Sequence, residues 1–304
     1  MGRSERVLSL QCWRRQQKDA RMVRACSAPD LQGGARPQRR DSRASGVLAW
    51  LVLLAALLPC GIAYAQGGPP FFTTDPGTPG NGNWEINVGT MASKQGDTRT
   101  YQLPQLDVNY GLGEQLQLTV EVPYVVQSTP GPQHQHGWGN ALIGAKWHFL
   151  AIPEGGWQVS TFPQVETAGT ESARRAGLAS EGPRLLLPLE VARRVGAVNV
   201  NLEAGYFVPR NGAHERFVGL AVGQQLDPRL EVDAEVFADR VSGQPTDVIL
   251  DAGLRYRFHP AFVLMCMAGR SVNGSIAPHS EFTGYLGLQI LLSDYGRSLS
   301  REGP

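Results

Sequence analysis

The chain has 304 residues, enough for one large all-β domain or two ordinary domains. Its 36 glycines, 21 prolines and charged fraction of only 18% are typical of many short strands joined by turns rather than of long helices. Residues 1–65 hold 11 of the 28 Lys+Arg and 4 of the 27 Asp+Glu, so the rest of the chain is mildly acidic. Nucleic-acid binding is therefore excluded, because it needs a concentrated basic face.

A secretory signal precedes the mature chain. From Val47 the sequence is apolar for about a dozen residues, which is too short for a transmembrane helix, and it ends in the small-x-small pattern of Ala63-Tyr64-Ala65. We predict a signal peptide at 46–65 that is cleaved between Ala65 and Gln66. Such a signal carries the chain through the inner membrane of a Gram-negative bacterium.

The residues before the signal and the cysteines carry no predicted function. Residues 1–45 are basic and unpatterned, and a later translation start, with Met22 as one candidate, would explain them. Three of the four cysteines precede the cleavage site, so Cys266 alone remains and neither an internal disulfide nor a cysteine zinc site can form. Cys266 lies in an apolar run and is interpreted as a small hydrophobic residue. No cofactor is expected.

Beyond the signal, apolar and polar residues alternate in segments of about ten residues, which is the pattern of transmembrane barrel strands. Leu230–Asp239 is the clearest example, because Glu231, Asp233, Glu235 and Asp239 all fall on one side of an extended chain. A helix would spread these acids around its circumference. The segment is therefore predicted to be a strand with one polar and one apolar face.

Similar segments recur along the whole mature chain. They are 84–94, 99–111, 115–127, 138–150, 156–167, 183–194, 197–208, 215–226, 229–240, 247–258, 261–272 and 281–292. Their even number returns both termini to the periplasm, and a closed cylinder leaves no unpaired strand edge in lipid. Tight links alternate with longer ones such as 129–137 and 168–182, which would all lie outside the cell. Two internal prolines, Pro123 and Pro188, are expected to mark bulges.

These observations predict an all-β fold, a closed antiparallel transmembrane β-barrel of about twelve strands with short periplasmic turns and longer extracellular loops. The barrel occupies 84–292, after a Pro/Gly-rich periplasmic lead-in at 66–83 and before a polar tail at 293–304. A soluble periplasmic β-sandwich is the alternative, but its strands are usually half as long. Either Leu292 or Tyr295 would serve as the terminal residue that the barrel-assembly machinery reads during insertion, or the tail is dispensable.

The mature chain resembles a known family in four places. They are Asp75-Pro76, Trp84-Glu85, the run LPQLDVNYGLG at Leu103–Gly113, and Glu121-Val122-Pro123. In these pieces, and over 70–292 as a whole, the chain is similar to the MetA-pathway phenol-degradation family. The resemblance implies an outer-membrane barrel of transporter type and gives no secure substrate.

The polar side of the predicted strands would line the lumen, and acids predominate on it. The candidate lumen residues are Glu85, Asp107, Glu121, Lys146, His148, Glu190, Glu203, Glu231, Asp233, Glu235, Asp251, Arg255 and Arg257. One interpretation is a polar conduit or ligand pocket that tolerates cations or weakly polar solutes. The other is a mutually paired polar core that fills a small barrel. The sequence leaves both open.

Other motifs are weaker. His134 and His136 have the spacing of metal ligands but lack a third one, so a solvated loop is favoured and no metal is expected. Arg174-Arg175 in the longest loop could contact lipopolysaccharide phosphates, although a solvated pair is favoured. An outer-membrane hydrolase would have to use His148 with Ser160, and nothing in the sequence orients this pair.

The sequence therefore predicts an outer-membrane barrel without enzymatic activity. We expect a pore or transporter for small molecules, and the family resemblance suggests aromatic or hydrophobic ones. The alternative is a non-transporting barrel with a structural or interaction role. The expected partners are outer-membrane lipid, lipopolysaccharide, the assembly machinery and an unidentified small solute.

Overall fold

The structure is a computed structural model that describes residues 68–130, 134–153, 156–180, 182–273 and 280–293. The predicted extension 1–45, the signal at 46–65, its cleavage site at Ala65 and Gln66, and most of the tail at 293–304 lie outside the described residues. No helix in the described segments is both long and apolar enough to cross a membrane.

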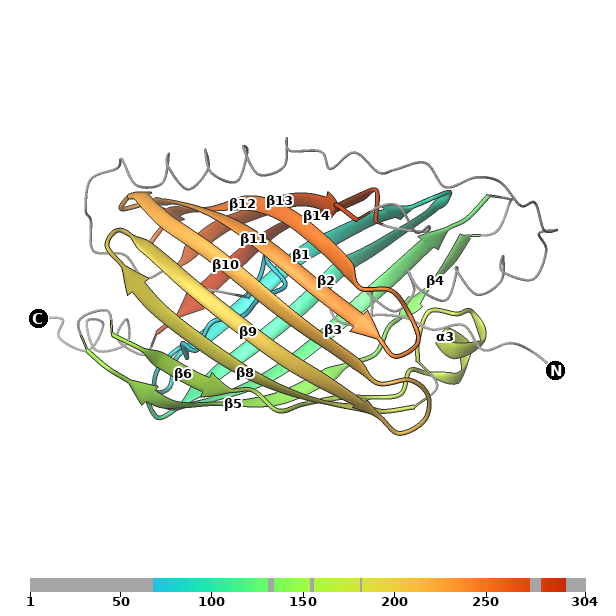
Figure 1. Ribbon diagram of the computed structural model, residues 1–304, viewed down its shortest axis with the longest axis horizontal. Helices are drawn as coiled ribbons and strands as arrows, with labels where there is room; N and C mark the ends of the chain where they lie inside the picture. Colours follow the sequence, from blue (N-terminus) through green and yellow to red (C-terminus); the bar gives the residue numbers. More distant parts are fainter. Residues whose placement is uncertain (1–67, 131–133, 154–155, 181, 274–279, 294–304) are drawn as a thin grey trace, which may run out of the picture.

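One sheet contains all the strands of the described segments (Figure 1). The elements in chain order are β1 (Trp84–Gln95), β2 (Thr98–Leu112), β3 (Leu116–Ser128), β4 (His134–Trp138), β5 (Leu142–Ala151), β6 (Gln158–Thr161), β7 (Gln164–Glu166), α3 (Glu171–Arg175), β8 (Arg184–Val195), β9 (Val198–Pro209), β10 (Glu215–Asp227), β11 (Leu230–Val241), β12 (Asp247–His259), β13 (Phe262–Ser271) and β14 (Phe282–Leu292).

The sheet closes on itself because β1 pairs with β14 as well as with β2, and every pairing is antiparallel. β4 and β5 both pair with β3, one beyond the other, so they are two parts of one wall strand. β6 and β7 likewise both lie between β5 and β8. The fourteen strands thus form the twelve wall strands of a closed barrel, and this confirms the predicted fold.

The irregularities in strand pairing lie beside the two prolines that were expected to mark bulges. Pro123 on β3 faces a register shift in β2, between Gln102 and Gln105. Pro188 on β8 lies beside the break between β6 and β7. The predicted link at 129–137 was too long, because β4 already begins at His134 and extends β3's hairpin.

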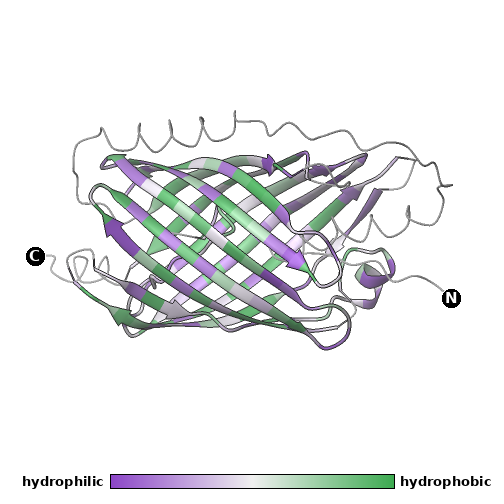
Figure 2. Ribbon diagram, in the orientation of Figure 1, coloured by the Kyte–Doolittle hydropathy of each residue, from purple (hydrophilic) through white to green (hydrophobic). Residues whose placement is uncertain are grey.

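Hydrophobic and hydrophilic residues alternate along the strands of the wall, as the bands of opposite colour in Figure 2 show. On β3, Leu118 and Val120 are 48% and 47% exposed, whereas Thr119 and Glu121 are buried. Apolar residues therefore cover the outside and polar residues point inward. This is the arrangement that a lipid environment imposes on a barrel.

The two ends of the barrel differ in their connections. At one end, here called the turn end, β1 starts, β14 finishes, and the links 113–115, 152–157, 196–197, 228–229 and 260–261 join neighbouring strands. At the other, the loop end, lie the links 129–133, 167–183, 210–214, 242–246 and 272–281, of which 167–183 and 272–281 are the longest. The β1–β2 link at 96–97 is also at the loop end and is tight. There Gly96 has a φ of +55°, which glycine adopts readily.

Candidate functional site: the barrel interior

The interior of the barrel holds part of the chain itself. Residues 68–80 precede β1 and run inside the wall (Figure 1). Phe71 is 3% exposed and Thr73 is fully buried, although neither belongs to a strand. We call residues 68–80 the inner segment. The expected periplasmic lead-in at 66–83 is thus largely placed within the barrel, because the wall offers it hydrogen-bond partners that water would otherwise provide.

Three glutamates of the wall accept hydrogen bonds from the inner segment. Glu235 on β11 accepts from the backbone N–H of Phe72 at 3.0 Å and of Thr73 at 2.6 Å, and also from the Thr73 hydroxyl. Glu203 on β9 accepts from the Thr74 N–H at 2.8 Å, while Glu190 on β8 accepts from the Thr74 hydroxyl. Part of the acid excess in the lumen is therefore matched by donors of the inner segment.

Two basic residues hold the same segment from other strands. Lys146 on β5 donates to the carbonyl oxygen of Asp75 and forms an ion pair with Glu190 at 3.2 Å. Arg255 on β12 donates through Nη2 to the carbonyls of Gly68 and Pro69, at 3.1 and 3.0 Å. Five wall strands thus contact the segment, which fixes it across the lumen.

Two glycines make room for this approach. A Cβ added to Gly219 on β10 would lie 2.0 Å from the Thr73 hydroxyl oxygen, and one added to Gly111 on β2 would lie 1.8 Å from the Gly80 carbonyl oxygen. Both distances are far below van der Waals contact. The wall is therefore shaped to admit the inner segment, since any larger side chain at these positions would displace it.

Toward the loop end the interior becomes apolar and aromatic. The rings of Phe207, Phe217 and Phe237 follow one another on β9, β10 and β11, with centroids 6.0 and 5.4 Å apart. Phe72 of the inner segment adds a fourth ring, 5.5 Å from Phe237. These four residues are here called the aromatic row. Buried methionines and a tyrosine lie on the other strands of the interior: Met91, Met265, Met267 and Tyr285.

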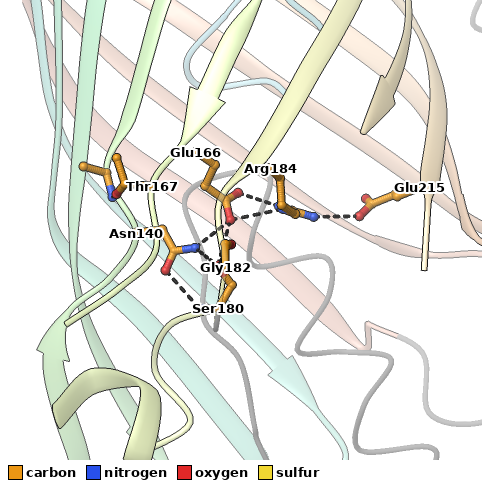
Figure 3. A network of polar contacts seen from close by, with 8 residues as sticks. Asn140, Glu166, Thr167, Ser180, Gly182, Arg184 and Glu215 are labelled. Atoms are coloured by element: carbon orange, nitrogen blue, oxygen red, sulfur yellow. Dashed lines mark hydrogen bonds and ion pairs between the residues drawn. The ribbon is translucent and has the colours of Figure 1, made fainter. Parts of the chain in front are cut away.

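A buried polar network lies beyond the aromatic row (Figure 3). Arg184 on β8 donates through Nε to Glu166 at 3.1 Å and pairs through Nη1 with Glu215 at 3.2 Å. Asn140, between β4 and β5, donates to Glu166 at 2.6 Å and accepts from the Ser180 N–H at 3.0 Å. The network therefore ties the loop at 167–183 to the wall.

The loop also packs against this end of the barrel. It contains α3, and its residues Ala173, Leu178 and Ala179 are buried in one cluster with wall residues Val125 and Leu186. Because apolar side chains of the loop meet inward-facing side chains of the wall, burial keeps the loop in place as the network does.

Most predicted lumen residues are buried inside the barrel. This group consists of Asp107, Glu121, Lys146, Glu190, Glu203, Glu231, Glu235, Asp251 and Arg255. Glu85, His148, Asp233 and Arg257 are partly exposed, and the Arg257 Nη1 bonds the Pro260 carbonyl in a turn at 3.2 Å. Only some of the thirteen contact the inner segment. The two interpretations of the lumen were both incomplete, because neither included a piece of main chain inside it.

The other candidate motifs do not assemble into a site. His148 and Ser160 face each other across β5 and β6, but the Ser160 hydroxyl donates to Glu190 rather than to the imidazole. The Nδ1 of His136 is 2.7 Å from the Tyr124 hydroxyl, within the β3–β4 hairpin. Arg175 pairs with Glu171 on α3 at 3.4 Å.

The network residues and the inner segment were missed by the sequence analysis. Arg184 and Glu215 are the first residues of their strands and have inward parity, so the period of two could have identified them. Asn140 and Ser180 lie in irregular chain, where no period exists. The inner segment carries no pattern that would distinguish it from an exposed linker.

Comparisons with known proteins agree with this architecture. No family model and no curated protein matches the chain. An outer membrane channel from Pseudomonas putida F1 matches with a TM-score of 0.59 and 13% identity, over 75% of this chain and 100% of that one. The NanC porin matches with a TM-score of 0.50 and 9% identity, over 67% of this chain and 98% of that one. The chain therefore has the fold of an outer-membrane β-barrel, the architecture that these channels share.

Proposed function

We propose that the protein is an outer-membrane channel for small molecules whose lumen is occupied by its own inner segment in the closed state. The observation that carries this proposal is the set of hydrogen bonds from Phe72, Thr73 and Thr74 to glutamates on three wall strands. The turn end would face the periplasm and the loop end the cell exterior, as in other bacterial barrels.

The contacts of the inner segment suit a part that can move. They include five hydrogen bonds to carboxylates, and these carboxylates can be hydrated once the segment leaves, whereas a buried apolar wall could not be. The segment is tethered to β1 at Trp84, at the turn end, so it can withdraw toward the periplasm without disturbing a wall strand. Its departure would leave an acidic lumen that favours cations and uncharged solutes.

The aromatic row supports small aromatic or hydrophobic molecules as the solutes. When Phe72 withdraws with the segment, Phe237 loses one ring neighbour and a flat apolar solute could stack in the place of Phe72. The same class of solute is implied by the resemblance to the MetA-pathway family, and membership of this family is part of the proposal. The polar side chains between the aromatic row and the turn end would then provide a hydrated path by which the solute leaves the barrel.

Planar-bilayer conductance of refolded protein tests the proposal. Residues 66–304 should insert and show small or rare openings, whereas residues 81–304, which lack the inner segment, should show large and long-lived ones. A Glu203→Gln/Glu235→Gln variant, which weakens the acceptors without changing volume, should lie between the two. If neither length of chain conducts, the non-transporting structural barrel becomes the better interpretation. A chain that stays soluble without detergent would refute the membrane location.

A further inference from the structure

We propose that the outer face of the β10–β11 hairpin binds the phosphate group of an outer-leaflet glycolipid, through Arg216 and Arg240. The proposal uses only the lipid-facing surface and rests on the outer-membrane location, not on transport. Arg216 is the second residue of β10 and Arg240 the second last of β11, so both lie at the loop end. Both are exposed, while their neighbours Glu215, Phe217, Asp239 and Val241 point inward.

The depth of the two arginines in the membrane follows from their neighbours. Toward the barrel centre, the same outer face continues with Val218, Leu220 and Val236, which are apolar and exposed. On the neighbouring strand and at the same level, Arg216 is paired with Tyr206, an exposed tyrosine on β9. Exposed tyrosines at strand ends lie at the head-group level of a bilayer. The arginines are therefore placed where lipid phosphates are found.

A bound anion would stabilise the pairing of these two arginines. Arg216 and Arg240 are direct cross-strand partners, and like charges in this relation destabilise a sheet. Among the described residues neither forms an ion pair with a carboxylate, since the acids beside them in sequence face the interior. Glu215, for example, is paired with Arg184 on the far side of the sheet. The repulsion remains uncompensated within the part of the chain that the structure describes.

The local structure also orders one member of the pair, Arg240. The Nε of Arg240 donates to the carbonyl of Gln244 at 3.1 Å, which fixes its guanidinium and leaves the Nη groups for another partner. The Ser242 N–H donates to the His214 carbonyl at 2.8 Å, so the two loops beyond the arginines are joined. Two arginines that are cross-strand partners at the membrane surface match a phosphate monoester, which accepts bidentate hydrogen bonds and carries up to two charges.

The test is direct binding of bisphosphorylated lipid A to the refolded mature protein in detergent free of lipopolysaccharide, measured by native mass spectrometry. An Arg216→Gln/Arg240→Gln variant should bind roughly tenfold or more weakly, because charge-assisted hydrogen bonds are lost. An Arg193→Gln/Arg229→Gln variant, which removes the same charge at the turn end, should bind as the wild type does. An Arg216→Lys/Arg240→Lys variant keeps the charge and should bind lipid A with intermediate affinity. It takes the place of the glutamine variant in this test if the glutamine variant does not fold.

Lipid A without its phosphates should bind the wild type as weakly as the intact lipid binds the glutamine variant. Equal binding of intact lipid A by the wild type and that variant would overturn the proposal. So would equal binding of dephosphorylated lipid A, or of phosphatidylglycerol, by the wild type. Because the site lies on the outer face, conductance of the glutamine variant should equal that of the wild type.

Discussion

At the scale of single residues, the position of the inner segment depends on the absence of a side chain at Gly219. Thr73 lies against this glycine while its N–H and hydroxyl bond Glu235. A strand position without a side chain is unfavourable for the strand itself. The glycine is explained by the close approach of the segment, which needs the space.

Gly219→Ala should therefore weaken the closed state. The added methyl would overlap the Thr73 hydroxyl, so the segment must shift and the open fraction in planar bilayers should rise. Gly182→Ala is the matched control, because its Cβ would lie 3.9 Å from Arg210, an ordinary contact. Unchanged conductance in Gly219→Ala would contradict the role given to the inner segment.

Arg184 illustrates a residue whose loss leaves buried charges unpaired. It is paired with Glu166 and Glu215, and all three side chains are at most 2% exposed. Removing one member of a buried ion pair costs about 3–5 kcal/mol, because the partner charge remains without compensation. Arg184→Met should lower the free energy of unfolding in detergent by this order.

The comparison for this measurement is Arg175→Met on α3. Arg175 pairs with Glu171 at the surface, where both side chains are more than 70% exposed, so its loss should cost less than about 1 kcal/mol. If the two variants unfold at the same denaturant concentration, the network at the loop end does not stabilise the barrel.

At the scale of elements, each strand is defined by its two faces. On β3 the outer residue Val120 lies among lipid-facing positions and its neighbours Thr119 and Glu121 lie in the lumen. A shift of one residue would exchange the faces and place Glu121 in lipid. The register is therefore fixed by the environment on both sides of the wall.

Val120→Arg should be strongly unfavourable for this reason. A basic side chain at the bilayer midplane costs about 2–4 kcal/mol, whereas near an interface it costs about 1 kcal/mol or less. Val195→Arg, at the turn end of β8, provides the interfacial control. Folding into lipid vesicles, followed by heat-modifiable electrophoretic mobility, measures both, and equal yields would argue against the lipid-facing assignment of Val120.

The interruption of the wall strand between β4 and β5 was not predicted by the alternation of apolar and polar residues. The strand predicted at 138–150 joins the last residue of β4 to most of β5, but Asn140 between them turns into the network with Glu166 and Ser180. The break is a tertiary effect, since the side-chain contacts of Asn140 replace the ladder at this position. Its partner Ser180 is 40 residues away.

At the scale of the whole molecule, the inner segment changes the electrostatics of the lumen. With the segment in place, Glu190, Glu203 and Glu235 accept its donors. Without it, the same carboxylates would face water and attract cations. The proposed closed and open states would therefore differ in charge selectivity as well as in width.

Residues 81–304 should accordingly form a cation-selective pore. Its reversal potential in a salt gradient should move toward zero in Glu190→Gln/Glu203→Gln, because two of the lumen charges are removed. Asp227→Asn, at the exposed last residue of β10, gives the control for a lost charge outside the lumen. Anion selectivity of the truncated chain would contradict this account of the lumen.

The sequence by itself determined the wall. The number of wall strands, their limits to within a few residues and the face of each side chain follow from a period of two, which is local and is imposed by lipid on one side and polar surroundings on the other. The inward parity of Glu203, Glu235 and Arg255 was therefore predictable.

Only the tertiary structure decided what fills the barrel. The inner segment has no periodicity, and its contact between Phe72 and Glu235 joins residues 163 positions apart. The same holds for the loop that carries Ser180, which bonds Asn140 40 positions away. Such contacts depend on the closure of the wall, which brings strands distant in sequence around one interior, and no local pattern records which irregular segment will occupy it.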